Sequence, residues 1–370
     1  MKKAGLYFIV ISIYLFSSCE NKSDNVDDIS IKMETNAELT DFIGNAYSVQ
    51  LETNDECLIG EIGKLCVDSQ FFYIMDETNK EVYIFNKSGS YISKISRRGS
   101  GPNEYIDITD IVVRKGLVYI LSSANKRIFI YDKNGNCQKT VVLNDWYHHI
   151  AVEEDKIILH SGKSNFQDFN IVVINHDGEI LNKHLPFMQK SNTMFNRSPF
   201  NKISDGTYLL TFPYDSRIAL LANNECSYKY KLNFNTNVIF KYSDIDNMTY
   251  EEIKEKALYK NTLRRINCVA LHKNSLFLIT EMFYDGLGIR ETLIKVNLND
   301  NSYISYRLND EINETYPYFS NLIYIEEDNI YSSKSTFSIN NIDKIRGETI
   351  KNIDLKEIDN PVIWIYNIRW

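Results

Sequence analysis

The feature that most constrains this chain is a strand pattern that recurs about every 45 residues. Each copy contains an apolar run, a polar turn, a second apolar run and a tight turn, as in QFFYIMDETNKEVYIFNKSG and GLVYILSSANKRIFIYDKNG. Aromatic and β-branched runs between turns rich in Asn, Asp and Gly are typical of β-hairpins. Six copies align, and the residues that open their closing turns are Asn86, Asp132, Asn175, Ala222, Asn297 and Lys344.

The spacing of the copies predicts the fold. The steps between successive turns are 46, 43, 47, 75 and 47 residues. A period near 45 with about four strands per unit is typical of propeller blades, so we predict an all-β fold, a six-bladed β-propeller. Many runs are apolar on both faces, as expected for strands covered by a blade on each side. A β-sandwich is the alternative, but it predicts one polar face per strand and no fixed period.

The long step and the chain ends complete this architecture. The segment TYEEIKEKALYK has helical composition and Thr249 as a possible cap, so we expect a small helical insertion between blades four and five, at about 240–263. AYSVQLET precedes the first copy and NPVIWIYNIRW ends the last. A strand from each end is expected to complete one shared blade and leave no free sheet edge. The propeller is therefore predicted to span 46–370.

The first residues predict export and lipid anchoring. Lys2 and Lys3 precede an apolar run at 4–16 and the sequence Ser17-Ser18-Cys19. The run is too short for a permanent membrane span, and small residues before a cysteine resemble a bacterial lipobox. We predict a lipoprotein signal peptide at 1–18, acylation of Cys19 and a flexible acidic tether at 19–45. A plain signal peptide with an incidental Cys19 is the alternative.

Charge and cysteine content exclude several classes of partner. The net charge is −8, and removing 1–18 takes away two lysines and no acid, which leaves −10. An acidic body argues against nucleic acid and against adhesion to anionic lipid, so the acyl group is the expected membrane link. The five cysteines after Cys19 are irregularly spaced and form no CxxC pair, so neither a zinc site nor a definite disulfide is predicted.

The stretch RRGSGPNEY, at 97–105, begins like a phosphate-binding loop. A strand, IDITDIVV, follows it, whereas phosphate loops precede a helix, and Glu104 stands where a dinucleotide motif needs a third glycine. We interpret the stretch as a link between blades. Glu104 and Tyr105 are expected to fasten blade two to blade one.

From this link to KNG at 133–135, the chain resembles an NHL-type propeller repeat. With the lipobox and the closing NPVIWIYNIRW, it is similar to the six-bladed β-propeller lipoproteins of Bacteroidetes. The resemblance implies a lipid-anchored protein of the outer membrane or cell surface, but no settled activity. NHL-type propellers include binding modules as well as metal-dependent lyases and lactonases, so the fold alone does not give the function.

Alignment of the innermost strands places six residues in one ring around the propeller channel: Lys64, Asp110, His149, Phe200, Cys268 and Leu322. His148 and His149 are adjacent, while the other histidines fall at unrelated blade positions. Too few carboxylates or imidazoles converge for a calcium or zinc enzyme, so we predict no metal and no cofactor. The alternative interpretation of His148 and His149 is a polar strand start.

A basic residue also recurs in several blades, where the turn between the second and third strands enters the third strand. These residues are Lys80, Arg127, Arg217 and Arg290. Cations on one face could hold an anionic or sugar-acid ligand, and nearby Tyr and Asp suit carbohydrate or protein contacts. The alternative is that each cation ties its own turn to a nearby acid. The candidate ligand-binding set is Arg127, His148, His149, Asp215, Arg217, Tyr284, Asp285 and Arg290.

These patterns predict an extracytoplasmic, lipid-anchored propeller that binds a glycan or a protein, or acts as a scaffold. No Ser-His-Asp order, phosphate loop or nucleophile elbow is visible, so no catalytic residue is assigned. A binding role is favoured over an enzymatic one. The alternative is a hydrolase or lyase acting on a glycan or lactone at the channel mouth.

Overall fold

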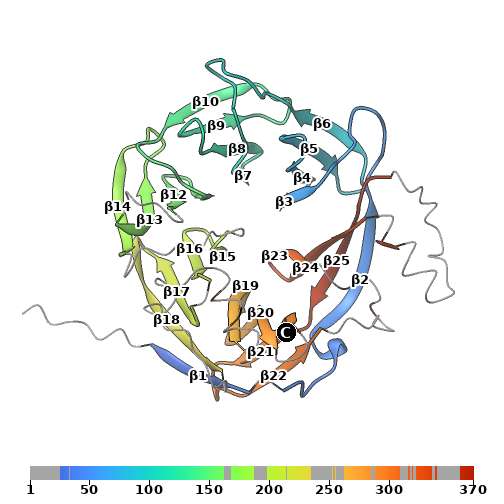
Figure 1. Ribbon diagram of the computed structural model, residues 1–370, viewed down its shortest axis with the longest axis vertical. Coiled ribbons are helices and arrows are strands. Elements are labelled where there is room, and N and C mark those ends of the chain that lie inside the picture. Colours follow the sequence, from blue (N-terminus) through green and yellow to red (C-terminus); the bar gives the residue numbers. More distant parts are fainter. Residues whose placement is uncertain are drawn as a thin grey trace, which may run out of the picture.

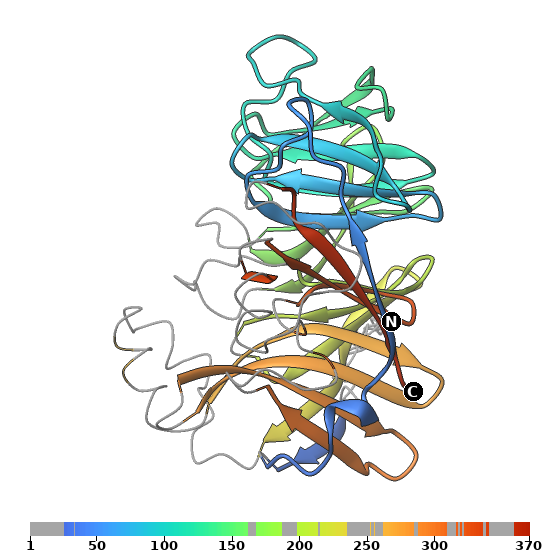
Figure 2. The same cartoon turned by 90° about the vertical axis from the view of Figure 1, so that its right-hand side faces the viewer.

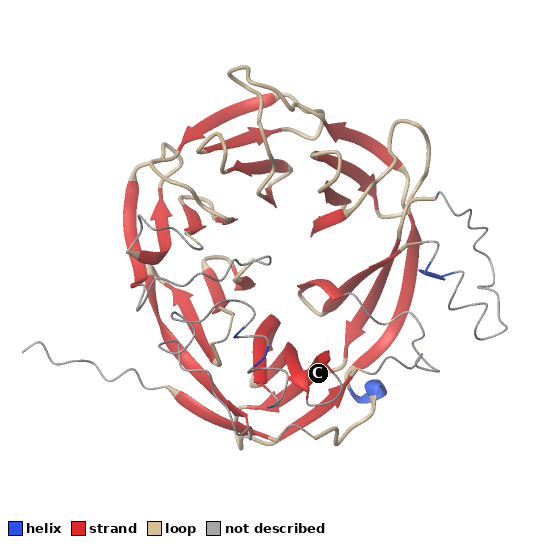
Figure 3. Ribbon diagram, in the orientation of Figure 1, coloured by secondary structure: helices blue, strands red, loops and turns tan. Residues whose placement is uncertain are grey.

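The computed structural model describes residues 26–32, 34–161, 168–186, 198–213, 215–234, 262–284, 288–308, 322–335 and 359–370, with a few single positions between them. Six β-sheets stand in a ring around a central axis (Figure 1). Strands make up nearly all the regular structure of the described residues (Figure 3). The predicted all-β, six-bladed propeller is confirmed.

Blades 1 to 3 are meanders of four consecutive strands, each beginning next to the axis. Blade 1 contains β3 (Ile62–Val67), β4 (Phe71–Asp76), β5 (Glu81–Asn86) and β6 (Tyr91–Ile95). Blade 2 contains β7 (Asp110–Arg114), β8 (Leu117–Ser122), β9 (Arg127–Tyr131) and β10 (Cys137–Val142). Blade 3 contains β11 (His149–Val152), β12 (Ile157–His160), β13 (Phe169–Ile174) and β14 (Ile180–Pro186).

Blades 4 and 5 depart from this pattern. Blade 4 contains β15 (Phe200–Ser204), β16 (Thr207–Thr211), β17 (Arg217–Ala222) and β18 (Glu225–Phe234), and a fifth strand, β1 (Asp27–Ile31), pairs in parallel with β18. Blade 5 contains β19 (Thr262–His272), β20 (Ser275–Tyr284), β21 (Gly288–Asn297) and β22 (Tyr303–Arg307). Its first three strands, orange in Figure 2, are about twice as long as most strands of blades 1 to 3.

Blade 6 is built from both ends of the chain. Its inner strands are β23 (Leu322–Glu326), β24 (Asn329–Lys334) and β25 (Val362–Ile368), and β2 (Ile43–Gln50) pairs antiparallel with β25 as the outermost strand. The predicted closure by one strand from each end is confirmed. Just before β25, the buried Asn360 donates to the carbonyls of Glu52 (2.7 Å) and Cys57 (2.6 Å) and accepts from the amide of Ile59 (2.8 Å).

The segment expected to be a flexible tether is structured from Asp27 onward, apart from residue 33, which is not described. Ile29 and Ile31 of β1 are buried against blade 4. The chain then crosses blade 5, where the amide of Asn36 donates to the carbonyl of Ser305 at 3.0 Å, and a 3-10 helix, η1 (Leu39–Asp41), leads into β2. The acid-rich composition suggested flexibility, but β1 pairs with β18 along its whole length, and Asp27 lies 2.8 Å from the ammonium of Lys229.

The expected helical insertion finds no support in the structure. Nearly all of 240–263 lies outside the described residues, and its last two residues, Thr262 and Leu263, begin β19. Cys19 and the predicted signal peptide also lie outside the described residues. No helix that the structure describes has the length and apolar character needed to cross a membrane.

Adjacent blades share their hydrophobic cores. One cluster joins Ile84 of blade 1 to Ile120 and Phe129 of blade 2, and another joins Leu121 of blade 2 to Ile150 of blade 3. Because each sheet is buried on both faces, its strands are apolar on both faces. This packing explains the lack of strict alternation in the sequence.

The RRGSGPNEY stretch is the link between blades 1 and 2. The Tyr105 hydroxyl lies 3.0 Å from the carbonyl of Lys80 and 3.1 Å from that of Ile95, both in or beside blade 1. Tyr105 therefore fastens the two blades, as predicted. Glu104 instead stays within the link, where its carboxylate accepts from the amide of Gly101 at 2.9 Å. We call the face that carries these links and the second-to-third-strand turns the link face.

Candidate functional site

Three ionisable side chains from consecutive blades meet on the innermost strands near the link face. Lys64 of β3 donates to Asp110 of β7, with 2.6 Å between Nζ and Oδ1. Nδ1 of His149, in β11, lies 3.5 Å from Asp110 Oδ2, which also accepts from the amide of Ile150 at 2.9 Å. Asp110 thus joins three blades, and the ring positions aligned from the sequence bring these three residues together.

The electrostatics of this triplet favour an ion pair. Burial by itself would raise the pKa of Asp110, but the charge on Lys64 and the nearby His149 hold that pKa below its ordinary value. Burial likewise opposes the charge on Lys64, and Asp110 nevertheless raises the pKa of this ammonium. Both groups are therefore charged near neutral pH.

The sequence analysis missed His160, which belongs to the same cluster. His160 of β12 pairs with His149 across the hairpin, and the two rings stack with centroids 5.5 Å apart. Burial, aided by His149, lowers the pKa of His160 well below 6.5, and burial also lowers the pKa of His148. Counting residues outward from the VEED turn would have placed His160 opposite His149, because hairpin register is fixed by the turn.

His149 is the one predicted site residue that is both deeply buried and incompletely hydrogen-bonded. It is 7% exposed, and in the described part of the chain neither ring nitrogen has a hydrogen-bond partner. Buried polar groups normally find partners, so this imidazole is suited to meet a ligand or water. The described residues contain no group of three or more His, Cys, Asp or Glu side chains arranged to hold a metal ion.

Asp215 and Arg217 form a local ion pair. Arg217 donates from Nε to Oδ1 at 2.9 Å and from one terminal nitrogen to Oδ2 at 2.8 Å. Its guanidinium also lies 3.9 Å from the ring centroid of Tyr228. This is the geometry of a cation that ties its own turn to a nearby acid. A ligand anion would have to compete with the buried Asp215 for this arginine.

The other candidates are spread over several blades. Arg127 begins β9, His148 is half-buried before β11, and Arg290 in β21 donates to the carbonyl of Ile289 at 2.8 Å. Tyr284 was expected to be exposed, but it is 3% exposed and its hydroxyl lies 2.7 Å from that of Thr292. The long strands of blade 5 explain this burial, because they extend the sheet over a position that looked like a turn. Asp285 lies outside the described residues.

Blade 5 places further charged residues near the link face that no sequence pattern had indicated. Irregular register in β19, at Arg264 and at Asn267, interrupts its pairing with β20. Arg264 and Arg265 both bind the buried carboxylate of Glu281, and Arg265 lies 2.6 Å from it. Burial would raise the pKa of Glu281, but the two arginines lower it. β-Bulges of this kind re-aim side chains, and they leave little trace in sequence.

Exposed apolar side chains recur on the link face. Leu58, Ile106 and Trp146 stand in three consecutive inter-blade links, and all three are exposed. Val142 ends β10 and Ile289 begins β21 at the same face, and both are exposed. The ammonium of Lys126 lies 3.5 Å from the Trp146 ring centroid. This face therefore combines apolar projections with cations, which is typical of interface surfaces.

The fold and this site define an all-β, six-bladed propeller whose inter-blade links carry polar and apolar surface residues. The chain belongs to the family described as Domain of unknown function (DUF4934), whose profile matches residues 25–367. No curated protein matches it.

Solved structures that share the fold include the following two. A Bacteroides fragilis protein described as a "Putative exported protein" is 19% identical, with a TM-score of 0.71 over 93% of this chain and 100% of its own. A member of the DUF4221 family from Bacteroides vulgatus is 9% identical, with a TM-score of 0.58 over 88% of this chain and 96% of its own. At these identities the likeness concerns the fold alone.

Proposed function

We propose that the protein is an extracytoplasmic, lipid-anchored propeller that binds a protein partner through its link face. The observation that carries the binding role is the exposure of Leu58, Ile106 and Trp146 in three successive links. Apolar side chains repeated on one face mark interaction surfaces more often than singly scattered ones do. Arg127 and His148 lie on the same face and would supply polar contacts beside these apolar side chains.

Two observations support the extracytoplasmic, lipid-anchored location. The N-terminal pattern has the form of a lipoprotein signal ending at Cys19, and a solved structure with the same fold is described as a "Putative exported protein". Cys19 precedes Asp27, the first residue of β1, by eight residues, which span at most about 28 Å when extended. An acyl group on Cys19 would therefore keep the rim of blade 4 close to the membrane.

Photo-crosslinking in the native cell envelope tests the binding role. We expect a benzoylphenylalanine at position 58, 106 or 146 to give the same crosslinked partner, because three neighbouring links would contact one surface. Leu181, which is exposed on the outermost strand β14, is the matched control position and should give no such adduct. Equal labelling from the link positions and from Leu181, or a different product at each position, would contradict the proposal.

Replacement of the predicted lipidation site tests the anchor. We expect Cys19→Ala to release the protein from the membrane fraction, since an acidic body offers little other attraction to lipid. The measurement is the share of protein in membrane and soluble fractions after lysis, together with incorporation of a labelled fatty acid. Cys137→Ala, at a half-buried cysteine of β10, is the control. Full membrane retention of Cys19→Ala would refute lipid anchoring.

No feature of the described residues favours the alternative of a glycan or lactone hydrolase or lyase over binding. The buried His149 could hydrogen-bond a ligand, but its neighbour Asp110 is held in an ion pair with Lys64. We therefore assign no catalytic residue.

A further inference from the structure

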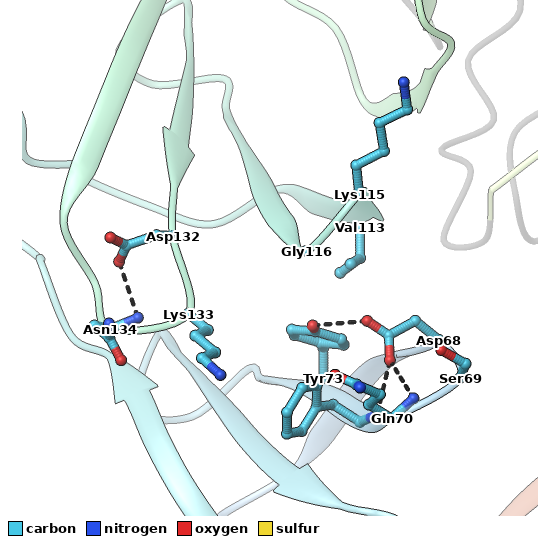
Figure 4. A pocket seen from close by; sticks show the side chains of 11 residues that line it. Asp68, Ser69, Gln70, Tyr73, Val113, Lys115, Gly116, Asp132, Lys133 and Asn134 are labelled. Carbon is cyan, nitrogen blue, oxygen red and sulfur yellow. Dashed lines mark hydrogen bonds between the residues drawn. The ribbon is translucent and has the colours of Figure 1, made fainter.

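A cavity opens between blades 1 and 2 on the face opposite the link face. Its volume is about 590 Å³, an ordinary size for a small-molecule site. Three turns form its walls: the β3–β4 turn with Asp68 and Gln70, the β7–β8 turn with Gly116, and the β9–β10 turn with Lys133 and Asn134 (Figure 4). No residue of the link-face site lines it.

The cavity carries a small net negative charge. Its lining contains two acids, Asp68 and Asp132, and two lysines, Lys115 and Lys133. Lys115 points away from Asp68 and Gln70 in Figure 4, and its ammonium lies 2.7 Å from the carboxylate of Glu154 outside the cavity. Asp68 and Asp132 then face only one ammonium inside the cavity, that of Lys133. The excess of negative charge disfavours a phosphate or another anionic ligand and favours a neutral one.

The polar groups of the cavity are only partly used. Asp68 accepts from the amides of Gln70 (2.8 Å) and Phe71 (2.7 Å) and from the Tyr73 hydroxyl (2.9 Å), which fixes its carboxylate and leaves one acceptor position. The side-chain amides of Gln70 and Asn134 make no hydrogen bond to any described residue, and both residues are exposed. Each amide can therefore donate and accept toward a ligand.

An aromatic wall accompanies these groups. Phe71 is half-buried, and its ring packs edge-on against Tyr73 with centroids 6.2 Å apart. The ammonium of Lys133 lies 5.1 Å from the Phe71 centroid, at the edge of the cavity. An aromatic face beside amides, a carboxylate and an ammonium suits a ligand that has C–H faces and many hydroxyl groups.

We propose that this cavity is a binding site for a neutral saccharide. Gln70 and Asn134 exchange hydrogen bonds with sugar hydroxyls, Asp68 accepts from a hydroxyl, and Phe71 contacts the C–H face of the ring. The site is independent of the proposed link-face function, because the two lie on opposite faces of the propeller.

Calorimetric titration of the purified full chain tests this site. The probes are neutral trisaccharides of glucose, xylose, mannose and N-acetylglucosamine, with a trisaccharide of galacturonic acid as the charged comparison. We expect saturable binding of at least one neutral probe and weaker binding of the charged one. The double variant Gln70→Ala/Asn134→Ala should weaken binding about tenfold or more, because it removes hydrogen bonds from two sides of the ligand.

The variants distinguish loss of saccharide binding from loss of folding. Both replaced side chains are exposed and make no hydrogen bond to the described residues, so the double variant should keep the wild-type melting temperature. Gln50→Ala, at an exposed amide of β2 on blade 6, is the matched control and should bind like the wild type. Absence of binding by all neutral probes, or binding that survives the double variant unchanged, would overturn the proposal. Loss of the link-face crosslinks would not count against the proposed saccharide site.

Discussion

Asp110→Ala is expected to lower the free energy of unfolding by about 2–4 kcal/mol. It leaves the Lys64 ammonium without its counter-ion and the buried amide of Ile150 without its acceptor. Removing one partner of a buried ion pair is costly because the remaining charge stays in a poorly solvated site. We place the loss below the highest values for such pairs because the Lys64 side chain keeps 20% exposure. Denaturant titration of the wild type and the variant measures this loss in the free energy of unfolding.

A double-mutant cycle distinguishes this mechanism from simple loss of packing. If the uncompensated charge causes the loss, Lys64→Met/Asp110→Ala should be more stable than Asp110→Ala alone. The ion pair also predicts a pH dependence. Because the folded pKa of Asp110 lies below its ordinary 3.8, its stabilisation is present above that value and is lost as the pH falls through the lowered pKa. Strictly additive effects of the two substitutions would contradict the mechanism.

Asn360→Ala is expected to destabilise the closure of the propeller by about 3 kcal/mol or more. Asn360 is fully buried and hydrogen-bonds the backbone of Glu52, Cys57 and Ile59, which lie 301 to 308 residues away in the sequence. The substitution removes three hydrogen bonds and leaves buried backbone groups without partners. Amide hydrogen exchange should show the largest loss of protection in β2 and β25, the two strands that close the ring.

Asn367→Ala provides the control for this prediction. Asn367 is a neighbouring asparagine of β25, it is only partly buried, and its side chain donates to Asn329 within the same blade. We expect a loss of about 1 kcal/mol or less, without selective opening of β2. Equal losses for Asn360→Ala and Asn367→Ala would mean that Asn360 has no special part in closure.

The strand repeat predicts the fold because every blade is packed in the same way against its two neighbours. Each unit must bury both faces of a four-stranded sheet, so the same turns and apolar runs recur from Phe71 to Asn297. Closure was also predictable, since an unpaired strand at each chain end needs a partner. The ring positions of Lys64, Asp110 and His149 followed from aligning equivalent strands.

Other features depend on contacts between residues far apart in sequence. Ile29 and Ile31 add a parallel strand to blade 4, although their acidic surroundings predicted a tether. Tyr284 is buried because blade 5 has unusually long strands, and Arg264 acts on Glu281 through irregular β19 pairing. Neither strand length nor bulges follow from local composition.

The sequence by itself determined the number of blades and the closure, because repetition and apolar patterning record how each strand is buried. Only the tertiary structure decided which side chains meet: Asp110 with Lys64 and His149, Asn360 with the first inter-blade link, and the turns that surround the cavity of Asp68 and Asn134. The physical reason is that hydrogen bonds and cavities depend on the relative placement of whole blades, whereas a strand's pattern depends only on what covers its own faces.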